Sequence, residues 1–133
     1  MRILLIAATL LFGCASTIEF APIDWQAQDQ PEKSQISITY RNTTEKTLCF
    51  TQDDWPNAAG KINSVDIDVA LIIGGKRFPM NAYDTGYCPT GCSLRVSPRQ
   101  EISGFFKYED FNLPENLYKE EKELEFAPNV EIC

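Results

Sequence analysis

VDIDVALII, residues 65–73, is the stretch that most clearly predicts an extended strand. Its odd positions are all aliphatic, whereas its even positions begin as aspartate and end as isoleucine. This two-residue period is typical of a strand with one buried face, and the second face is expected to start solvated and finish covered. Gly74-Gly75 follows, before a second strand-like run over residues 76–80. Two glycines between such runs predict a tight hairpin, because both turn residues can take positive φ.

Other short runs along the chain show the same alternation. Apolar residues recur in 36–40 and the pattern resumes over 47–50 after a turn, which predicts a second hairpin. Pro79 has no backbone N–H, so the strand after the glycine pair is expected at a sheet edge or to end there. Residues 115–123 are expected to hold one helical turn or a charged loop. Further strand candidates are 94–96, 101–108, 124–126 and 130–132.

Roughly six to eight short strands at fairly regular spacing predict an all-β sandwich. Around Pro98 the chain runs strand, proline turn, strand, an arrangement that resembles immunoglobulin-like domains of bacterial envelope proteins. The resemblance is one of pattern, and it implies a single immunoglobulin-like β-sandwich over residues 34–133. We find no internal repeat and no boundary within that range.

The first thirteen residues have a different character. Arg2 precedes an uncharged, mostly apolar run over residues 3–12. A membrane-spanning helix needs about 20 apolar residues, so this run is too short to span and has the size of a signal-peptide core. It ends in Leu11-Phe12-Gly13-Cys14, which resembles a bacterial lipobox, although Phe12 departs from the small or branched residue usual there. The resemblance implies that Cys14 becomes the lipidated N-terminus, carrying a diacylglyceryl thioether and an N-acyl group such as palmitate.

Lipidation of Cys14 would place the protein in the cell envelope, tethered to a membrane, because two or three acyl chains hold firmly. Ala15 follows the cysteine, where aspartate signals inner-membrane retention in enterobacterial lipoproteins, so the resemblance favours the outer membrane, facing the periplasm. The expected organisation is a signal peptide over 1–13, a lipid-anchored tether over 14–33 and a β-sandwich over 34–133. The alternative is an ordinary signal peptide cut nearby, with Cys14 discarded or left free.

Four cysteines remain in the exported part, which predicts two disulfides. We favour Cys88–Cys92, since the proline and glycine between them can fold that stretch back on itself, together with Cys49–Cys133, which would pin the tail to a strand. The alternative is that Cys88 or Cys92 pairs with Cys49. A zinc site is not expected, because its usual ligands come as two close pairs and here there is one.

Net charge limits the partners of the mature chain. Without Arg2 the 12 basic residues fall to 11, against 19 acidic ones, so residues 14–133 carry a side-chain charge of −8. Nucleic acid and anionic lipid surfaces require a basic face, and neither is an expected partner. A basic protein would be attracted, although acidity also serves solubility alone.

The absence of histidine removes most catalytic and metal chemistry. Ser-His-Asp and Cys-His catalysis need it, and it is the commonest metal ligand. The acidic pairs Asp53-Asp54 and Glu109-Asp110 are typical of solvated surface, and Asp66 with Asp68 would need a third ligand to hold calcium. We therefore expect no enzyme, no catalytic residue, no metal and no cofactor.

Two loops combine acids with aromatic residues and are the candidate partner-binding sites. Aromatic side chains supply interface energy, acids select a basic partner, and a rigid loop loses less entropy on binding. The alternative is that Trp55 folds over the core and Tyr87 packs beside the disulfide. The six candidates are Asp53, Asp54, Trp55, Tyr83, Asp84 and Tyr87.

Three functions remain open. The first is a tethered envelope module that binds another protein, for example as an inhibitor or immunity-type protein for a basic partner such as a lysozyme. This hypothesis rests on analogy with a class of small, lipid-anchored β proteins and on no recognised motif. The second is a structural or assembly subunit of an envelope complex, which would use an exposed sheet edge for strand addition. The third, a carboxylate-based enzyme, would need two acids facing each other across a cleft, and the sequence disfavours it.

Overall fold

The computed structural model of this chain describes residues 24–51, 56–57, 59–62, 68–81, 93–128 and 130–133. Within these ranges the structure has β-strands and short 3-10 helices but no α-helix, so the all-β prediction is confirmed. The 3-10 helices are η1 (Pro31–Lys33), η2 (Tyr108–Phe111) and η3 (Glu115–Leu117). The strands are β1 (Trp25–Gln30), β2 (Gln35–Arg41), β3 (Leu48–Thr51), β4 (Ala70–Ile73), β5 (Lys76–Pro79), β6 (Ser93–Val96), β7 (Glu101–Lys107), β8 (Glu123–Glu125) and β9 (Val130–Ile132).

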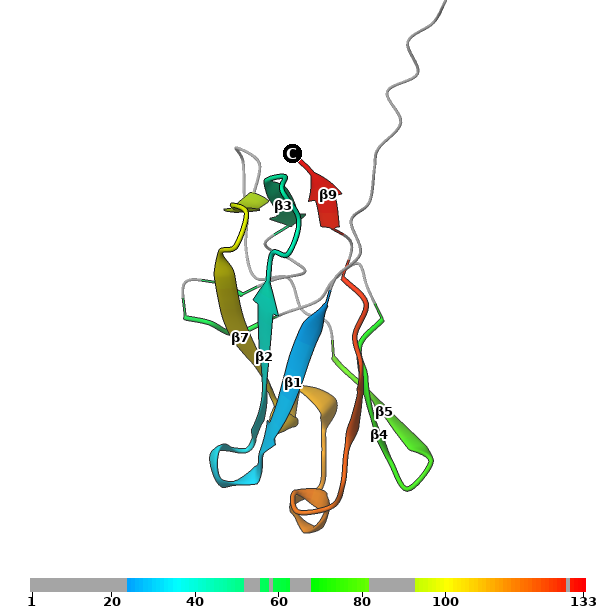
Figure 1. Ribbon diagram of the computed structural model, residues 1–133. Coiled ribbons are helices and arrows are strands. Elements are labelled where there is room, and N and C mark those ends of the chain that lie inside the picture. Colours follow the sequence, from blue (N-terminus) through cyan, green and yellow to red (C-terminus); the bar gives the residue numbers. More distant parts are fainter. Residues whose placement is uncertain (1–23, 52–55, 58, 63–67, 82–92, 129) are drawn as a thin grey trace, which may run out of the picture.

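The strands form three small antiparallel sheets, in the orders β1-β2-β7, β6-β3-β9 and β5-β4-β8. Figure 1 shows β3 and β9 at the top of the molecule and the turns that follow β1, β4 and β7 at the bottom. We call the end formed by β3, β6 and β9 the disulfide end. We call the end formed by η1, η2, η3 and the β4–β5 turn the turn end.

One hydrophobic core joins the three sheets. Alternate residues of β2 and β7 face it, as the sequence predicts, while the residues between them are more exposed. The ring of Tyr40 on β2 lies 5.4 Å from that of Phe50 on β3, and the ring of Phe106 on β7 lies 5.1 Å from that of Phe126. Aromatic contacts of this kind add to the free energy gained by burying apolar surface.

The hairpin predicted at Gly74-Gly75 is confirmed. Ile73 pairs with Lys76 across the turn, and both glycines have positive φ, 56° and 79°, as the twist of a two-residue hairpin requires. Val69, Leu71 and Ile73 are buried, in agreement with the odd-position pattern. β5 is an edge strand, as Pro79 indicates.

The hairpin predicted between residues 36–40 and 47–50 is wrong. β2 pairs with β1 and β7, whereas β3 belongs to another sheet and pairs with β6 and β9. The sheets meet at a corner built on Asn42, which is fully buried. The Asn42 side chain donates to the carbonyl oxygens of Lys46 and Val96, at 2.8 and 3.0 Å, and its Oδ1 accepts from Thr44. The Asn42 side chain thus satisfies a carbonyl of the turn and a carbonyl of β6 where a hairpin would have backbone pairs between its strands.

The chain crosses the same corner a second time between β6 and β7. Asn42 N donates to Gln100 O at 2.9 Å, and Arg99 N donates to Asn42 O at 2.8 Å. Pairing of β2 with β7 therefore continues past the corner into pairing of β3 with β6. The predicted strand, proline turn, strand arrangement is present, but the proline turn connects two sheets.

The first strand lies in the segment that the sequence assigns to the tether. β1 pairs with β2 along its whole length, from Trp25 opposite Tyr40 to Gln30 opposite Gln35, and η1 follows it. Residues Trp25–Lys33 are thus part of the fold. The pattern gave little sign of this, because β1 is an edge strand whose residues, Trp25 and Gln30 apart, are exposed.

Cys49 and Cys133 form a disulfide, which confirms that part of the predicted pairing. Their Cα atoms lie 5.2 Å apart, and Cys133 N donates to Thr47 O at 3.0 Å, so the tail is held against β3. Cys88 and Cys92 lie outside the described residues. Within the described part of the chain, no helix has the length and apolar character needed to cross a membrane.

Candidate functional site

The sequence-predicted site residues cannot be placed. Cys14, Asp53, Asp54, Trp55, Tyr83, Asp84, Tyr87, Cys88 and Cys92 all lie outside the described residues. The segments that flank the two candidate loops are described, however, and they meet at Asp110. Lys61, which follows one loop, lies 3.0 Å from the Asp110 carboxylate, and Asn81, which precedes the other, donates its N–H to Asp110 O at 2.7 Å.

Asp110 is a buried residue whose contacts are within the chain. Its side chain is 5 % exposed, and besides pairing with Lys61 it accepts from Lys107 N at 3.2 Å. The sequence predicts a solvated acid at this position, and that prediction is wrong. Asp68, the one described member of the Asp66/Asp68 pair, lies 2.7 Å from Arg77 Nη2, so its carboxylate is occupied by a cation of the chain itself.

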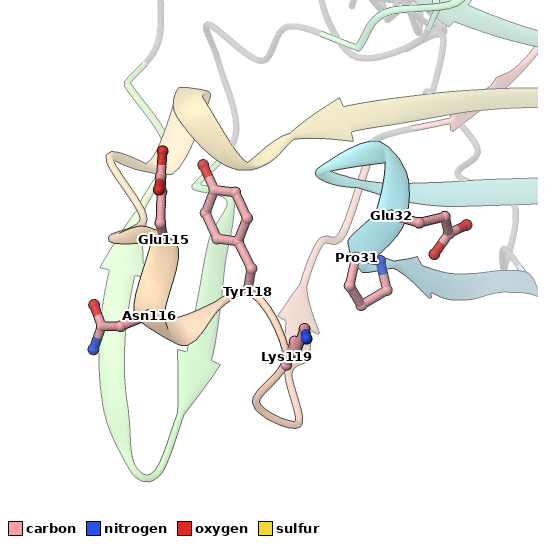
Figure 2. A pocket seen from close by; sticks show the side chains of 6 residues that line it. All are labelled: Pro31, Glu32, Glu115, Asn116, Tyr118 and Lys119. Carbon is pink, nitrogen blue, oxygen red and sulfur yellow. The ribbon is translucent and has the colours of Figure 1, made fainter.

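A hollow lies at the turn end, between η1 and the segment that contains η3 (Figure 2). Its volume is about 650 Å³, within the range of pockets that hold ligands. Pro31 and Glu32 form one side, and Glu115, Asn116, Tyr118 and Lys119 form the other. In Figure 2, the side chains of Glu115 and Tyr118 extend in the same direction, whereas the carboxylate of Glu32 is directed away from them.

The three-residue period of η3 explains why this segment lines hollows on two sides. Side chains three positions apart overlap in a 3-10 turn. Glu115 and Tyr118 therefore share one face, which lines the first hollow. Pro114, Leu117 and Glu120 share another face, which lines a second hollow of about 500 Å³. Across the second hollow are the β4–β5 hairpin residues Ile73, Gly74, Lys76 and Phe78.

The wall between the two hollows is fixed by a buried lysine. The Lys122 side chain has no exposed surface, and its amine donates to Asp29 Oδ2 at 2.9 Å, Tyr118 O at 2.6 Å and Glu120 O at 2.8 Å. All three ammonium protons thus have an acceptor. The amine also lies 4.8 Å from the centre of the Tyr108 ring, a cation–π contact. The segment that carries Tyr118 is thereby held to β1, which favours a preformed site.

Tyr108 completes this support. Its hydroxyl donates to Asp29 Oδ1, and its ring lies 4.7 Å from that of Tyr118 in an edge-on contact. Burial raises the pKa of Tyr108, and the hydrogen bond to Asp29 and the charges of Asp29 and Glu32 raise it further. Tyr108 is therefore a neutral donor at physiological pH.

Negative charge gathers at the turn end. The linings of the two hollows contain four glutamates and two lysines, a net charge of −2. Residues 108–125, which run from η2 to β8, contain seven acids and two lysines, a net charge of −5. One of the two lysines, Lys122, is buried in its ion pair with Asp29. The free carboxylates around the two hollows include the exposed residues Glu115, Glu120 and Glu121. The potential at this end favours a cationic ligand.

Sequence reasoning missed this site. It expected one helical turn or a charged loop over residues 115–123, where the structure has η3, and it assigned no binding role there; the signal available was the density of acids around Leu117 and Tyr118. No cluster of three or more metal-ligating side chains occurs in the part of the chain that the structure describes. No known protein family, no curated protein and no solved structure matches this chain.

Proposed function

We propose that this protein is a lipid-anchored module of a bacterial cell envelope that binds a basic partner protein through its turn end. The observation that carries the proposal is the excess of acids over lysines, four to two, in the linings of the two hollows that flank η3. Acids around a partly apolar hollow attract a basic partner and offer it surface to bury. An inhibitor or immunity-type protein acts in this way, and lysozymes are a class of basic partner.

The direction of β1 supports this arrangement. β1 begins at Trp25, beside the Asn42 corner, and ends at Gln30, beside η1. Five residue steps along a strand span about 17 Å. A chain anchored at Cys14 would enter the domain at the start of β1, and the turn end would face away from the membrane, where a partner can reach it.

The immunoglobulin-like sandwich belongs to the same proposal. Two facing layers are supported by the hydrophobic core that the sheets share. They are also supported by two contacts of β1: the ring of Trp25 lies 5.7 Å from that of Phe126, and Asp29 pairs with Lys122. These contacts bring β1 alongside the residues before and after β8. In this arrangement β2 continues through the corner at Asn42 into β3, and β6 continues into β7, within one layer. Strands that bend in this way occur in β-sandwiches.

The anchor is tested by labelling cells with radioactive palmitate. We expect the wild-type protein to be labelled and to sediment with membranes, and Cys14→Ser to abolish the label. A variant with Ala15→Ser controls for a change next to the anchoring residue. Equal labelling of the Cys14→Ser and wild-type proteins would contradict lipidation at Cys14.

Partner binding is tested with the full-length protein in detergent, immobilised for surface plasmon resonance. The probes are a panel of basic lysozymes and a fractionated envelope extract. The turn-end variant replaces Glu115, Glu120 and Glu121 with lysine, and its matched control replaces the exposed Glu45, Glu101 and Glu131, which lie away from the turn end. We expect the turn-end variant alone to lose binding, by tenfold or more in association rate, about 1.4 kcal/mol. Capture of an envelope complex that both variants retain would instead favour an assembly subunit.

A further inference from the structure

We infer that the partner segment straddles η3 in extended form, with a lysine or arginine side chain in the first hollow and an apolar side chain in the second. This inference rests on the proposed function and names the chemistry of its ligand. The two hollows have different linings, and they lie on either side of one short segment, because Asn116 lines the first and the next residue, Leu117, lines the second.

The first hollow suits one basic side chain. Its charged residues are Glu32, Glu115 and Lys119, and since the Glu32 carboxylate is directed away, Glu115 is the acid that a basic side chain would meet there. Glu115 and Tyr118 both line this hollow, so a carboxylate and an aromatic ring are available to the same side chain. A lysine or arginine can pack its aliphatic stem on the ring of Tyr118 and on Pro31 and present its head to Glu115.

The second hollow suits an apolar side chain. Ile73, Phe78, Pro114 and Leu117 are half of its eight lining residues, and its charged residues are Lys76, Glu120 and Glu121. Lys76 lies over the Phe78 ring at 5.0 Å, and Leu117 is half-buried against the core. A leucine, isoleucine or phenylalanine entering here removes apolar surface from water on both molecules.

An extended segment can reach both hollows at once. Alternate side chains of a strand point to the same side, so the basic and apolar residues are an even number of positions apart. Two positions correspond to about 7 Å and four to about 13 Å. The partner signature is therefore a basic residue and an apolar residue at i and i+2 or i and i+4.

The test is a titration of the isotope-labelled full-length protein in detergent micelles, followed by amide and methyl NMR. The probes are capped peptides with the cores Arg-Ser-Leu and Arg-Ser-Gly-Ser-Leu. Comparison peptides replace arginine with glutamate or leucine with serine. We expect at least one of the two probes to shift signals of Asn116 and Tyr118 together with those of Leu117 and Phe78, and each comparison peptide to bind about tenfold more weakly.

Two variants locate the basic side chain. Glu115→Gln is expected to weaken peptide binding about fivefold. Glu32→Gln, the same change on the opposite side of the hollow, is expected to change the affinity less than twofold. Leu117→Ser is expected to remove only the contribution of the peptide's leucine to binding. The spread of the amide signals of this variant reports whether the protein is folded.

Three results would overturn the inference. They are an absence of shifts around η3 at millimolar peptide, shifts of equal size with the glutamate peptide, and an equal effect of Glu32→Gln and Glu115→Gln. If the peptides fail while the lysozyme or envelope partner still binds and is lost in the turn-end variant, this inference falls and the proposed function stands. If the peptides bind and no protein partner is captured, the proposed function falls.

Discussion

Asp29 and Lys122 form an ion pair whose two members are buried to different degrees. The amine of Lys122 has no exposed surface, whereas the carboxylate side chain of Asp29 is 31 % exposed, and the two lie 2.9 Å apart. The pair connects the edge strand β1 to the segment that supports Tyr118. The loss of folding free energy should therefore depend on which of the two residues is replaced.

Asp29→Asn is expected to cost more than Lys122→Met. The first change leaves a buried ammonium without its counter-charge, at about 3 kcal/mol, whereas the second leaves an acid that water can solvate, at about 1–2 kcal/mol. Urea unfolding followed by tryptophan fluorescence measures both. Combining the two changes should cost less than the sum of the singles. A larger cost for Lys122→Met would show that packing of the lysine stem outweighs its charge.

Tyr108→Phe should change how stability depends on alkaline pH. Burial, followed by the bond to Asp29, raises the pKa of Tyr108 above the usual value of 10.0. The unfolded chain ionises this tyrosine from about pH 10 while the folded one does not, so the folded state loses relative stability as pH rises above that value. The variant should be about 1–2 kcal/mol less stable at pH 7, since it lacks a hydrogen bond to a charged group, and should lose less on going to pH 11.

Unfolding midpoints in urea between pH 7 and pH 11 measure this difference. Burial also raises the pKa of Tyr40, so part of the alkaline fall remains in the variant and serves as an internal reference. Parallel curves for the two proteins would mean that Tyr108 does not cause the steeper fall.

Asn42→Ala should destabilise the corner between sheets. The change removes donors from the carbonyl groups of Lys46 and Val96 in a fully buried site, which should cost about 2–4 kcal/mol. Thr43→Ala, an exposed neighbour, is the matched control and should stay within about 0.5 kcal/mol. Similar midpoints for the two variants in thermal unfolding would contradict the role of Asn42.

Loss of the Cys49–Cys133 bond should weaken the fold strongly. The bond joins residues 84 positions apart, so removing it frees a long loop in the unfolded state, at about 4.6 kcal/mol in the chain-entropy description. The double change to alanine, studied by urea unfolding, gives the cost. Mass spectrometry after alkylation of the native, unreduced protein should find neither cysteine modified, and modification of both would contradict the pairing.

The sequence predicted the elements whose cause is local. The glycine pair specifies the β4–β5 turn by its backbone freedom, and the period of two in β2, β4 and β7 identifies the faces that are buried. The pairing of Cys49 with Cys133 also followed from the position of each cysteine.

The sequence did not predict features that depend on distant partners. The sequence of residues 42–46 predicts a hairpin turn, because nothing local indicates the buried hydrogen bond of Asn42 to Val96, 54 positions away. The hollow at η3 likewise depends on η1, more than 80 positions earlier, and on the burial of Lys122, which looks in the sequence like one more surface charge. Periodicity carries no information on such contacts.

The orientation of β1 also has a mechanical consequence. Under the proposed anchoring, a partner that pulls on the turn end while lipid holds the N-terminal side stretches the domain along β1. The six residue pairs that join β1 to β2, from Trp25 with Tyr40 to Gln30 with Gln35, are then loaded together in shear. A strand loaded lengthwise must break its hydrogen bonds at once, whereas one pulled from its end peels off pair by pair. A domain anchored in this way would resist tension in the direction in which its tether transmits it.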